Sequence, residues 1–221
     1  MQAASPKTLL SLKNLKKSYD RPVVQGSFEL EEGERVALIG PSGIGKSTLL
    51  HLISGILRPD QGSIVFRGQE LNELKEAALD SFRARNIGYI FQSFYLLEGL
   101  TVLENVEAAV TFAGATHYDR ARELLCKMGL DDRLDHFPAQ LSVGQRQRVA
   151  VARAVVNSPP LILADEPTAN LDRVRAEEVL ALITESCEAS GAALLVVSHA
   201  PETLKEFDRI LDYQAHFQEA L

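Results

Sequence analysis

Residues 40–48 read GPSGIGKST and match the pattern G-x-x-x-x-G-K-[ST]. The apolar run 35–39 (RVALI) leads directly into them, and a helical pattern follows from about residue 46. A glycine-rich loop in this position lets successive backbone N–H groups and the positive end of the helix point at one anion. Because a flanking strand and helix are the context that supports this pattern, the stretch predicts a phosphate-binding loop. The alternative is a glycine-rich turn without function.

The residue types of this loop suit a nucleotide, ATP, with a magnesium ion. The glycines allow the backbone to wrap closely around phosphate oxygens. Lys46 supplies a mobile positive charge for the β- and γ-phosphates, Ser47 offers a hydroxyl to magnesium, and Thr48 adds a second hydroxyl. The predicted nucleotide-binding positions are Gly40, Pro41, Ser42, Gly43, Ile44, Gly45, Lys46, Ser47 and Thr48.

A second apolar run ends in two adjacent carboxylates. Residues 160–168 read PLILADEPT, so Asp165 and Glu166 stand where a buried strand would end. The carboxyl ends of parallel strands meet at one edge of a sheet, and the phosphate loop emerges at the same edge. We predict that Asp165 holds the magnesium shell and that Glu166 polarises the attacking water. Taken alone, such a pair is more commonly a solvated strand end.

Strand and helix patterns alternate along much of the chain, as in an α/β fold. Continuous apolar runs predict parallel strands at 35–39, 87–91, 160–165 and 193–198, and helical patterns lie at about 46–56, 117–128, 144–156 and 173–189. Short β-type segments at 9–15, 27–31 and 63–66, with turns marked by Gly26, Gly33, Gly62 and Gly68, predict an antiparallel flank. The stretch from about 94 to 155 has helical candidates but no strand. We predict one domain with a core of about 1–92 and 156–221 and a helical subdomain at about 93–155.

Composition narrows the function classes. The chain has 221 residues, of which 46% are hydrophobic, and a formal net charge of -7, which argues against a dedicated nucleic-acid binder. Cys126 and Cys187 are its only cysteines and both fall in helical patterns, so a disulfide framework and a CxxC metal site are excluded. No apolar run approaches the roughly 20 residues of a spanning helix, and the N-terminal residues lack a signal-peptide core. We therefore expect any membrane contact to come through a partner.

Further segments, in order, resemble the motifs of the ATP-binding-cassette (ABC) ATPase family, and the resemblance covers nearly the whole chain. Gln92 follows the run IGYIF and resembles the family's Q-loop glutamine, while His199 follows ALLVVS and resembles its switch histidine. Residues 170–172 resemble the D-loop, with Asn170 and Asp172, and Tyr19 resembles the aromatic residue that stacks on adenine. Taken singly, each has a structural alternative: a surface glutamine, a strand-end histidine or a half-buried tyrosine.

The resemblance implies a fold and a set of roles. The fold is a P-loop NTPase (RecA-like) core with an antiparallel β flank and an inserted helical subdomain. Glu166, His199 and Gln92 would be catalytic, with His199 contacting the γ-phosphate and ordering the attacking water. The implied magnesium ligands are Ser47, Gln92 and Asp165.

The run LSVGQRQRVAVARA at 141–154 resembles the family signature that opens a helix. In the family, Ser142 and Gly144 would address the γ-phosphate held by the other protomer, because a helix N-terminus presents unpaired N–H groups. The resemblance therefore implies a two-fold homodimer that closes around two ATP molecules. The predicted signature positions are Ser142, Val143, Gly144 and Gln145.

Three features depart from the family pattern. Val143 replaces the usual glycine of the signature, and a β-branched residue there would weaken closure if the loop needed a positive φ. Ile44 stands where a small polar residue is common, and we expect it to point away from phosphate. The tail HFQEAL, residues 216–221, lacks the glycine turn that often closes the family's last strand pair.

Within the family, the stretches FQSFYLLEGLTVLENV and HFPAQLSVGQRQRVAVARAVVNSP are most similar to small bacterial ATPases of the macrolide-export, lipoprotein-release and cell-division group. The resemblance implies a subunit at the cytoplasmic face of the bacterial inner membrane that drives a separate membrane permease. Two other hypotheses are a nucleotide-gated scaffold with weak turnover and a cassette that acts on DNA or ribosomes. The second cassette, coiled-coil insertion or basic extensions typical of the last class are absent from the sequence.

Overall fold

The computed structural model describes residues 7–169, 171–199, 204 and 207–218. Its larger sheet is entirely parallel, as the continuous apolar runs predicted. Along all of β7 and β8 every residue is buried, which explains why only the last residue of each is polar. The strands, in spatial order, are β6 (Ile87–Ile90), β7 (Leu161–Asp165), β8 (Ala193–Ser198), β3 (Arg35–Ile39) and β9 (Arg209–Asp212).

A second, antiparallel sheet forms the predicted flank. Its strands, in spatial order, are β2 (Pro22–Glu31), β1 (Thr8–Ser18), β4 (Gln61–Phe66) and β5 (Gln69–Glu70). The prediction that Gly62 marks a turn is wrong, because Gly62 lies inside β4, and the same prediction for Gly26 is wrong, because Gly26 lies inside β2. A Cβ at this position would lie 2.2 Å from the carbonyl oxygen of His216, so the glycine allows another segment to approach the strand closely.

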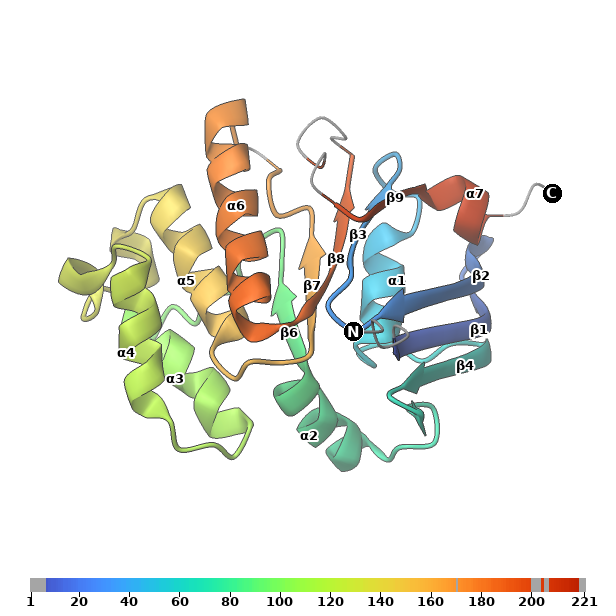
Figure 1. The fold of residues 1–221 in the computed structure, drawn as a ribbon, viewed down its shortest axis with the longest axis horizontal. Helices are drawn as coiled ribbons and strands as arrows, with labels where there is room; N and C mark the ends of the chain where they lie inside the picture. The colour runs from blue at the N-terminus through green and yellow to red at the C-terminus, as the bar shows by residue number, and fades with distance from the viewer. Residues whose placement is uncertain (1–6, 170, 200–203, 205–206, 219–221) are drawn as a thin grey trace, which may run out of the picture.

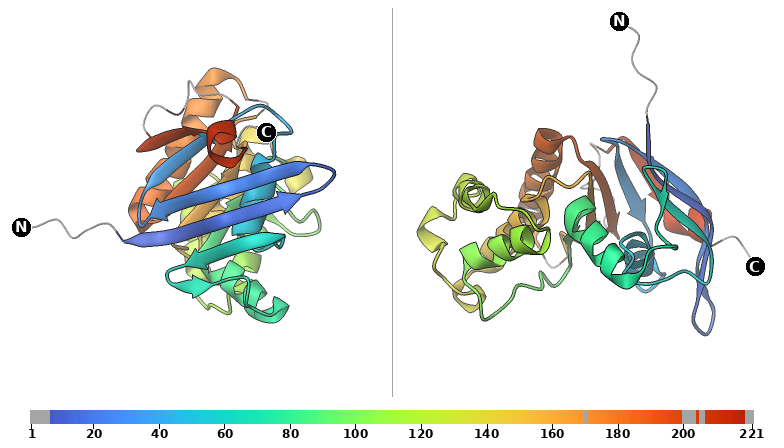
Figure 2. Two further views of the ribbon diagram at one scale, coloured as in Figure 1. Left: turned by 90° about the vertical axis from the view of Figure 1, so that its right-hand side faces the viewer. Right: turned by 90° about the horizontal axis from the view of Figure 1, so that it is seen from below.

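Helices form the layers on either side of the parallel sheet (Figure 1). α1 lies between the two sheets, α5 and α6 cover the opposite face of the parallel sheet, and α3 and α4 pack beyond α5 (Figures 1 and 2). None of the helices in the described part of the chain is long and apolar enough to cross a membrane. The helices are α1 (Lys46–Ile53), α2 (Glu76–Asn86), α3 (Val102–Phe112), α4 (Tyr118–Lys127), α5 (Val143–Val155), α6 (Arg173–Ser190) and α7 (Tyr213–Phe217).

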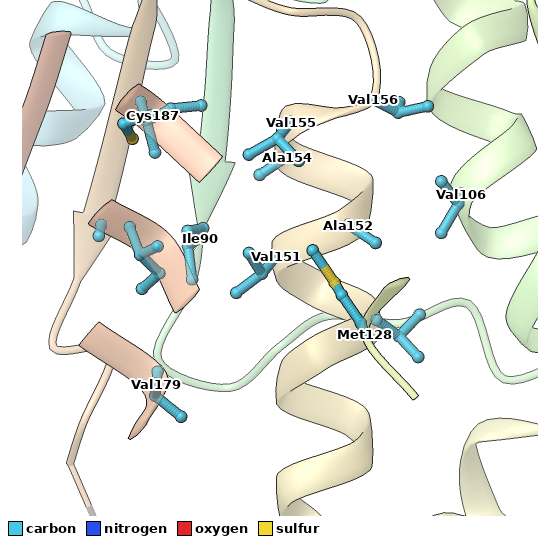
Figure 3. Packing of buried hydrophobic residues seen from close by; sticks show 14 of the residues in the cluster. Ile90, Val106, Met128, Val151, Ala152, Ala154, Val155, Val156, Val179 and Cys187 are labelled. Carbon is cyan, nitrogen blue, oxygen red and sulfur yellow. The ribbon is translucent and has the colours of Figure 1, made fainter. Parts of the chain in front are cut away.

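The helix α5 joins the helical layer to the sheet. In Figure 3, Val151 and Val155 project from α5 toward Ile90 of β6, while Val156 faces Val106 of α3. All of these side chains are buried in one hydrophobic cluster, which continues onto α4 and α6. A separate cluster fills the space between the two sheets, around α1. The parallel sheet is therefore covered by apolar contacts on both faces.

Several elements were not predicted, among them α2, β5, β9 and α7. α2 buries only Leu79 and Phe82, so its apolar periodicity is weak. β9 is an edge strand that includes Arg209 and Asp212, and it has no continuous apolar run. α7 has five residues, too few for a periodic pattern. In addition, α1 ends before the predicted residue 56, because the chain leaves the helix near Gly55, which has a φ of 69°.

We infer that residues 93–155 form a subdomain inserted into an α/β core. The described elements of this stretch are helical, and α3 and α4 lie at the end of the molecule opposite the antiparallel sheet (Figure 1). The hydrophobic cluster shared by α5 and the parallel sheet means that the subdomain has no separate core of its own.

The contact between β6 and α5 leaves no room for a side chain at Gly88. An added Cβ would lie 2.2 Å from the carbonyl oxygen of Ala154 and 2.5 Å from Cδ1 of Ile162. We expect Gly88→Ala to lower the free energy of unfolding by roughly 1–3 kcal/mol, measured by urea denaturation. Gly99→Ala is the control, because an added Cβ there meets nothing within 4 Å, and we expect a change within about 0.5 kcal/mol. Equal stabilities of the two variants would contradict this packing.

Candidate functional site

The phosphate-loop pattern lies between β3 and α1, at the carboxyl edge of the parallel sheet. Gly40 follows β3 directly and its N–H donates to the carbonyl oxygen of Ser198 at the end of β8 (3.2 Å). Gly45 caps α1 with a φ of 118°, and an added Cβ would lie 2.5 Å from the carbonyl oxygen of Val23. Only glycine fits this conformation and this space. The N-terminus of α1, with its positive dipole end, therefore faces the loop.

Lys46 is almost fully buried and lies at the centre of the loop's contacts. Its Nζ donates to the carbonyl oxygens of Gly40 (2.7 Å) and Pro41 (3.0 Å) and lies 3.1 Å from Oε1 of Glu166. A buried ammonium group is costly unless it is paired and hydrogen-bonded, and here it is both. The lysine thus connects the phosphate loop to the end of β7.

Glu166 stands between two cationic or potentially cationic side chains. Its Oε2 lies 2.7 Å from Nδ1 of His199 and accepts a bond from the backbone N–H of His199 (3.3 Å). Glu166 also has a φ of 47°, a conformation that a residue with a side chain adopts at a cost. Its backbone N–H donates to the carbonyl oxygen of Val197 (3.0 Å), so the chain is held in this turn by the neighbouring strand. The result is a carboxylate fixed between Lys46 and His199.

Asp165, the last residue of β7, is hydrogen-bonded to Ser47. The Ser47 hydroxyl donates to Oδ1 of Asp165 (3.0 Å). Burial raises the pKa of Asp165 above its usual value, although the hydrogen bond from Ser47 opposes this shift. This arrangement joins the first turn of α1 to the end of β7.

Ser47, Asp165 and Gln92 supply a hydroxyl, a carboxylate and an amide oxygen, which are the oxygen ligands that Mg²⁺ prefers. Among the residues that the structure describes, no group of three or more His, Cys, Asp and Glu side chains could hold a metal ion by itself. Magnesium is commonly bound through one or two carboxylates together with substrate phosphates. The donor set fits that mode of binding.

A cavity of about 370 Å³ brings half of the predicted site residues together, and Asp165 is not part of its lining. Tyr19 stands at its rim with 61% of its surface exposed, as a face on which a flat ring could stack. Gly40, Pro41 and Ile44 of the predicted loop are outside this lining, and the Ile44 side chain is buried in the core cluster around α1. The lining residues are Tyr19, Val23, Ser42, Gly43, Gly45, Lys46, Ser47, Thr48, Gln92, Glu166 and His199.

The signature residues 142–145 are not part of this cavity. Ser142 caps α5, because its hydroxyl oxygen accepts a hydrogen bond from the backbone N–H of Gln145 (3.3 Å). In turn, Oε1 of the Gln145 side chain accepts a hydrogen bond from the backbone N–H of Ser142 (2.9 Å). Val143 is the first helical residue and is 43% exposed. The φ of Val143 is not positive, so this β-branched residue does not carry the backbone strain that a positive φ would cause. What remains is its bulk at an exposed helix N-terminus.

The structure describes the predicted D-loop only in part. Asn170 lies outside the described residues. Asp172 caps α6, because its side chain accepts a bond from the N–H of Arg175 (3.1 Å).

Two residues near the site were not found from the sequence. Val23 lines the cavity, and nothing in the local sequence marks it. Arg153 of α5 donates to the carbonyl oxygens of Phe94 (2.5 Å) and Tyr95 (2.6 Å), just beyond Gln92. Phe94 and Tyr95 have positive φ values, 61° and 46°, so Arg153 holds a strained segment in place. Burial lowers the pKa of the Arg153 guanidinium from its usual value.

Comparison with known proteins agrees with the predicted family and fold. The family model for the ABC transporter matches residues 24–169. An ABC transporter ATP-binding protein of Thermotoga maritima, described as uncharacterized, is 50% identical over 183 residues, which is 81% of this chain and 78% of that protein. The lipoprotein-releasing system ATP-binding protein LolD of Chromohalobacter salexigens is 45% identical over 187 residues, which is 83% of this chain and 79% of that protein.

Solved structures agree as well. A dimeric, post-hydrolysis state of the ATP-binding cassette MJ0796 bound to ADP and Pi superimposes with a TM-score of 0.85, at 37% identity, over 93% of this chain and 94% of that chain. Another dimeric structure of MJ0796, described as a bacterial ABC transporter cassette, gives the same values. The cavity at the sheet edge, the matching family model and these relatives together show that the chain belongs to the ABC transporter family, as an ATP-binding ATPase cassette.

Proposed function

We propose that this cassette binds ATP with Mg²⁺ in the cavity at the sheet edge, hydrolyses it as a homodimer, and thereby drives a separate membrane permease. The observation that carries the proposal is the position of Glu166, held between Lys46 (3.1 Å) and His199 (2.7 Å) beside the phosphate loop. A carboxylate fixed beside a phosphate site has the position that water activation requires.

Lys46 and the N-terminus of α1 provide positive charge for the phosphates. In the structure the Lys46 Nζ bonds two carbonyl oxygens of its own loop. A flexible stem lets this ammonium exchange a carbonyl for a phosphate oxygen without leaving the site. Tyr19, exposed at the rim, would stack on the adenine ring.

Glu166 polarises the attacking water, and His199 fixes the carboxylate. With the proton on Nδ1, His199 donates to Oε2 of Glu166, and its Nε2 remains available to the γ-phosphate or to water. Ser47, Gln92 and Asp165 would hold Mg²⁺, which when bound neutralises charge that develops on the phosphates.

The signature residues complete the site from a second protomer. Ser142 and Gly144 stand at the exposed N-terminus of α5 and outside the cavity of their own chain. A helix N-terminus that faces a γ-phosphate across a two-fold axis would link two protomers through two ATP molecules. Hydrolysis would then remove the phosphate that bridges them. The dimeric state described for MJ0796 supports this arrangement.

The permease partner is inferred from relatives. LolD is the ATP-binding protein of a lipoprotein-releasing system, and the described helices of this chain do not span a membrane. We therefore place the protein at the cytoplasmic face of a bacterial inner membrane, held there by its permease. The process is export, lipoprotein or lipid release, or mechanotransmission, and the permease selects the substrate.

A second candidate is a nucleotide-gated scaffold with weak turnover. Val143 supports it, because a β-branched side chain at an exposed signature position adds bulk where a partner's nucleotide would approach. The two candidates differ in the hydrolysis rate of the permease-bound dimer.

Replacement of the water-polarising carboxylate tests the assigned roles. We expect Glu166→Gln to lower kcat for ATP hydrolysis by about 10²–10³-fold while nucleotide binding persists, because the amide keeps the shape but cannot act as a base. Lys46→Ala should instead weaken nucleotide binding, since it removes the phosphate's positive partner. Phosphate release and titration calorimetry measure the two effects. An unchanged hydrolysis rate in Glu166→Gln would contradict the role of Glu166 as the water-polarising carboxylate.

Dimer closure can be observed directly in the same variant. We expect Glu166→Gln to shift from monomer to dimer when ATP and magnesium are added, as measured by light scattering on a sizing column, because ATP persists at the interface. Val143→Gly in this background is the matched comparison. Dimerisation of both variants supports the transport hypothesis. If only the glycine variant dimerises, the bulk of Val143 blocks closure and the scaffold is favoured; if neither does, the proposed ATP-bridged dimer is wrong.

A further inference from the structure

The segment 213–218, which comprises α7 and Gln218, lies directly behind the phosphate loop. It follows β9, the strand that pairs with β3 just before the loop. The segment packs onto β2, where an added Cβ at Gly26 would lie only 2.2 Å from the carbonyl oxygen of His216 (Figure 1). The sequence marked this region as a departure from the family pattern, and the functional site described above does not use it.

Tyr213 fills the space behind two loop glycines. Its side chain is fully buried, and its hydroxyl donates to the carbonyl oxygen of Val23 (3.0 Å). A Cβ added at Gly45 would lie 2.9 Å from this hydroxyl oxygen, and one added at Gly40 would lie 3.1 Å from the Tyr213 Cβ. The Tyr213 side chain therefore fills the space beside both ends of the loop, and it is not part of the lining of the nucleotide cavity.

Gln218 holds the middle of the loop. Its Nε2 donates to the carbonyl oxygen of Ile44 (2.9 Å). The Ile44 side chain is 8% exposed and packs into the core around α1, so the residue is held by both its backbone and its side chain. Gly43 and Gly45, on either side of it, line the nucleotide cavity and both have positive φ values.

We propose that Tyr213 and Gln218, at the two ends of this segment, are positioning residues that hold the phosphate loop in its binding conformation before nucleotide arrives. The proposal rests on the function proposed above, in which this loop binds the phosphates of ATP. Phosphate recognition needs several backbone N–H groups aimed at one point, and a loop rich in glycine is otherwise free to adopt many conformations. Contacts at Gly40, Ile44 and Gly45 remove that freedom in the free protein, so less conformational entropy is lost on binding.

The hydrogen bond from Gln218 can be removed with little change in shape. Gln218→Met keeps the length of the side chain and its neutrality but removes the donor. We expect the Kd for ADP and for ATP with magnesium, and the KM for ATP, to rise about three- to tenfold, the effect of one hydrogen bond. kcat at saturating ATP should stay within about twofold, because Glu166 and His199 are untouched.

Gln214→Met is the matched control, because Gln214 is an exposed glutamine of α7, the helix that ends just before Gln218. We expect its Kd, KM and kcat to stay within about twofold of the parent values. Tyr213→Phe is a second test, since it removes only the hydroxyl that bonds Val23, and it should raise the Kd for ADP in the same direction. A lower melting temperature with unchanged Kd in both Gln218→Met and Tyr213→Phe would overturn the proposal, because it would show a purely structural role.

Lys46→Ala separates this proposal from the one on which it depends. If Lys46→Ala binds nucleotide as the parent does, the phosphate loop is not the ATP site and both proposals fail. If Lys46→Ala loses binding while Gln218→Met and Gln214→Met have equal Kd values, only the positioning role is wrong. Weaker binding in Gln218→Met than in Gln214→Met supports it.

Discussion

The buried ammonium of Lys46 is the contact on which the site depends. It lies within 3.1 Å of the Glu166 carboxylate and within hydrogen-bond distance of two carbonyl oxygens in its own loop. A charge with this little exposure to solvent requires partners on all sides, so the loop after β3 and the strand end of β7 must meet. The parallel sheet makes that meeting possible, because all of its strands end at one edge.

Residues with unusual backbone conformations also lie at the carboxyl edge of the parallel sheet. Gly45 caps α1 with a φ of 118°, and Glu166 has a φ of 47°. Neighbouring backbone maintains these conformations: Val197 holds the amide of Glu166, and Val23 and Tyr213 enclose Gly45. The rest of the fold thus supports geometry that short isolated segments would not keep, which is common at sites that bind or react.

The helix α5 carries two features at opposite ends. Its N-terminus holds Ser142 and the exposed Val143, and near its C-terminus Arg153 bonds the backbone beyond Gln92. The side chains between them pack against β6 on one side and against α3 on the other (Figure 3). A rigid helix of this kind connects the surface proposed to face a second protomer with the segment that carries a cavity residue.

The sequence by itself determined four of the five parallel strands, the antiparallel flank, the phosphate-loop pattern and the carboxylates of β7. Strands buried on both faces must be apolar throughout, and a phosphate loop needs glycines and a lysine at fixed spacing, so both leave a local record. Only the tertiary structure decided that Gly26 lies within a strand, that β9 and α7 exist, and that Val23, Arg153, Tyr213 and Gln218 approach the site. These features depend on contacts between residues far apart in the chain. The close approach of the His216 carbonyl oxygen to Gly26, like the hydrogen bond from Gln218 to Ile44, leaves no periodic pattern in either segment.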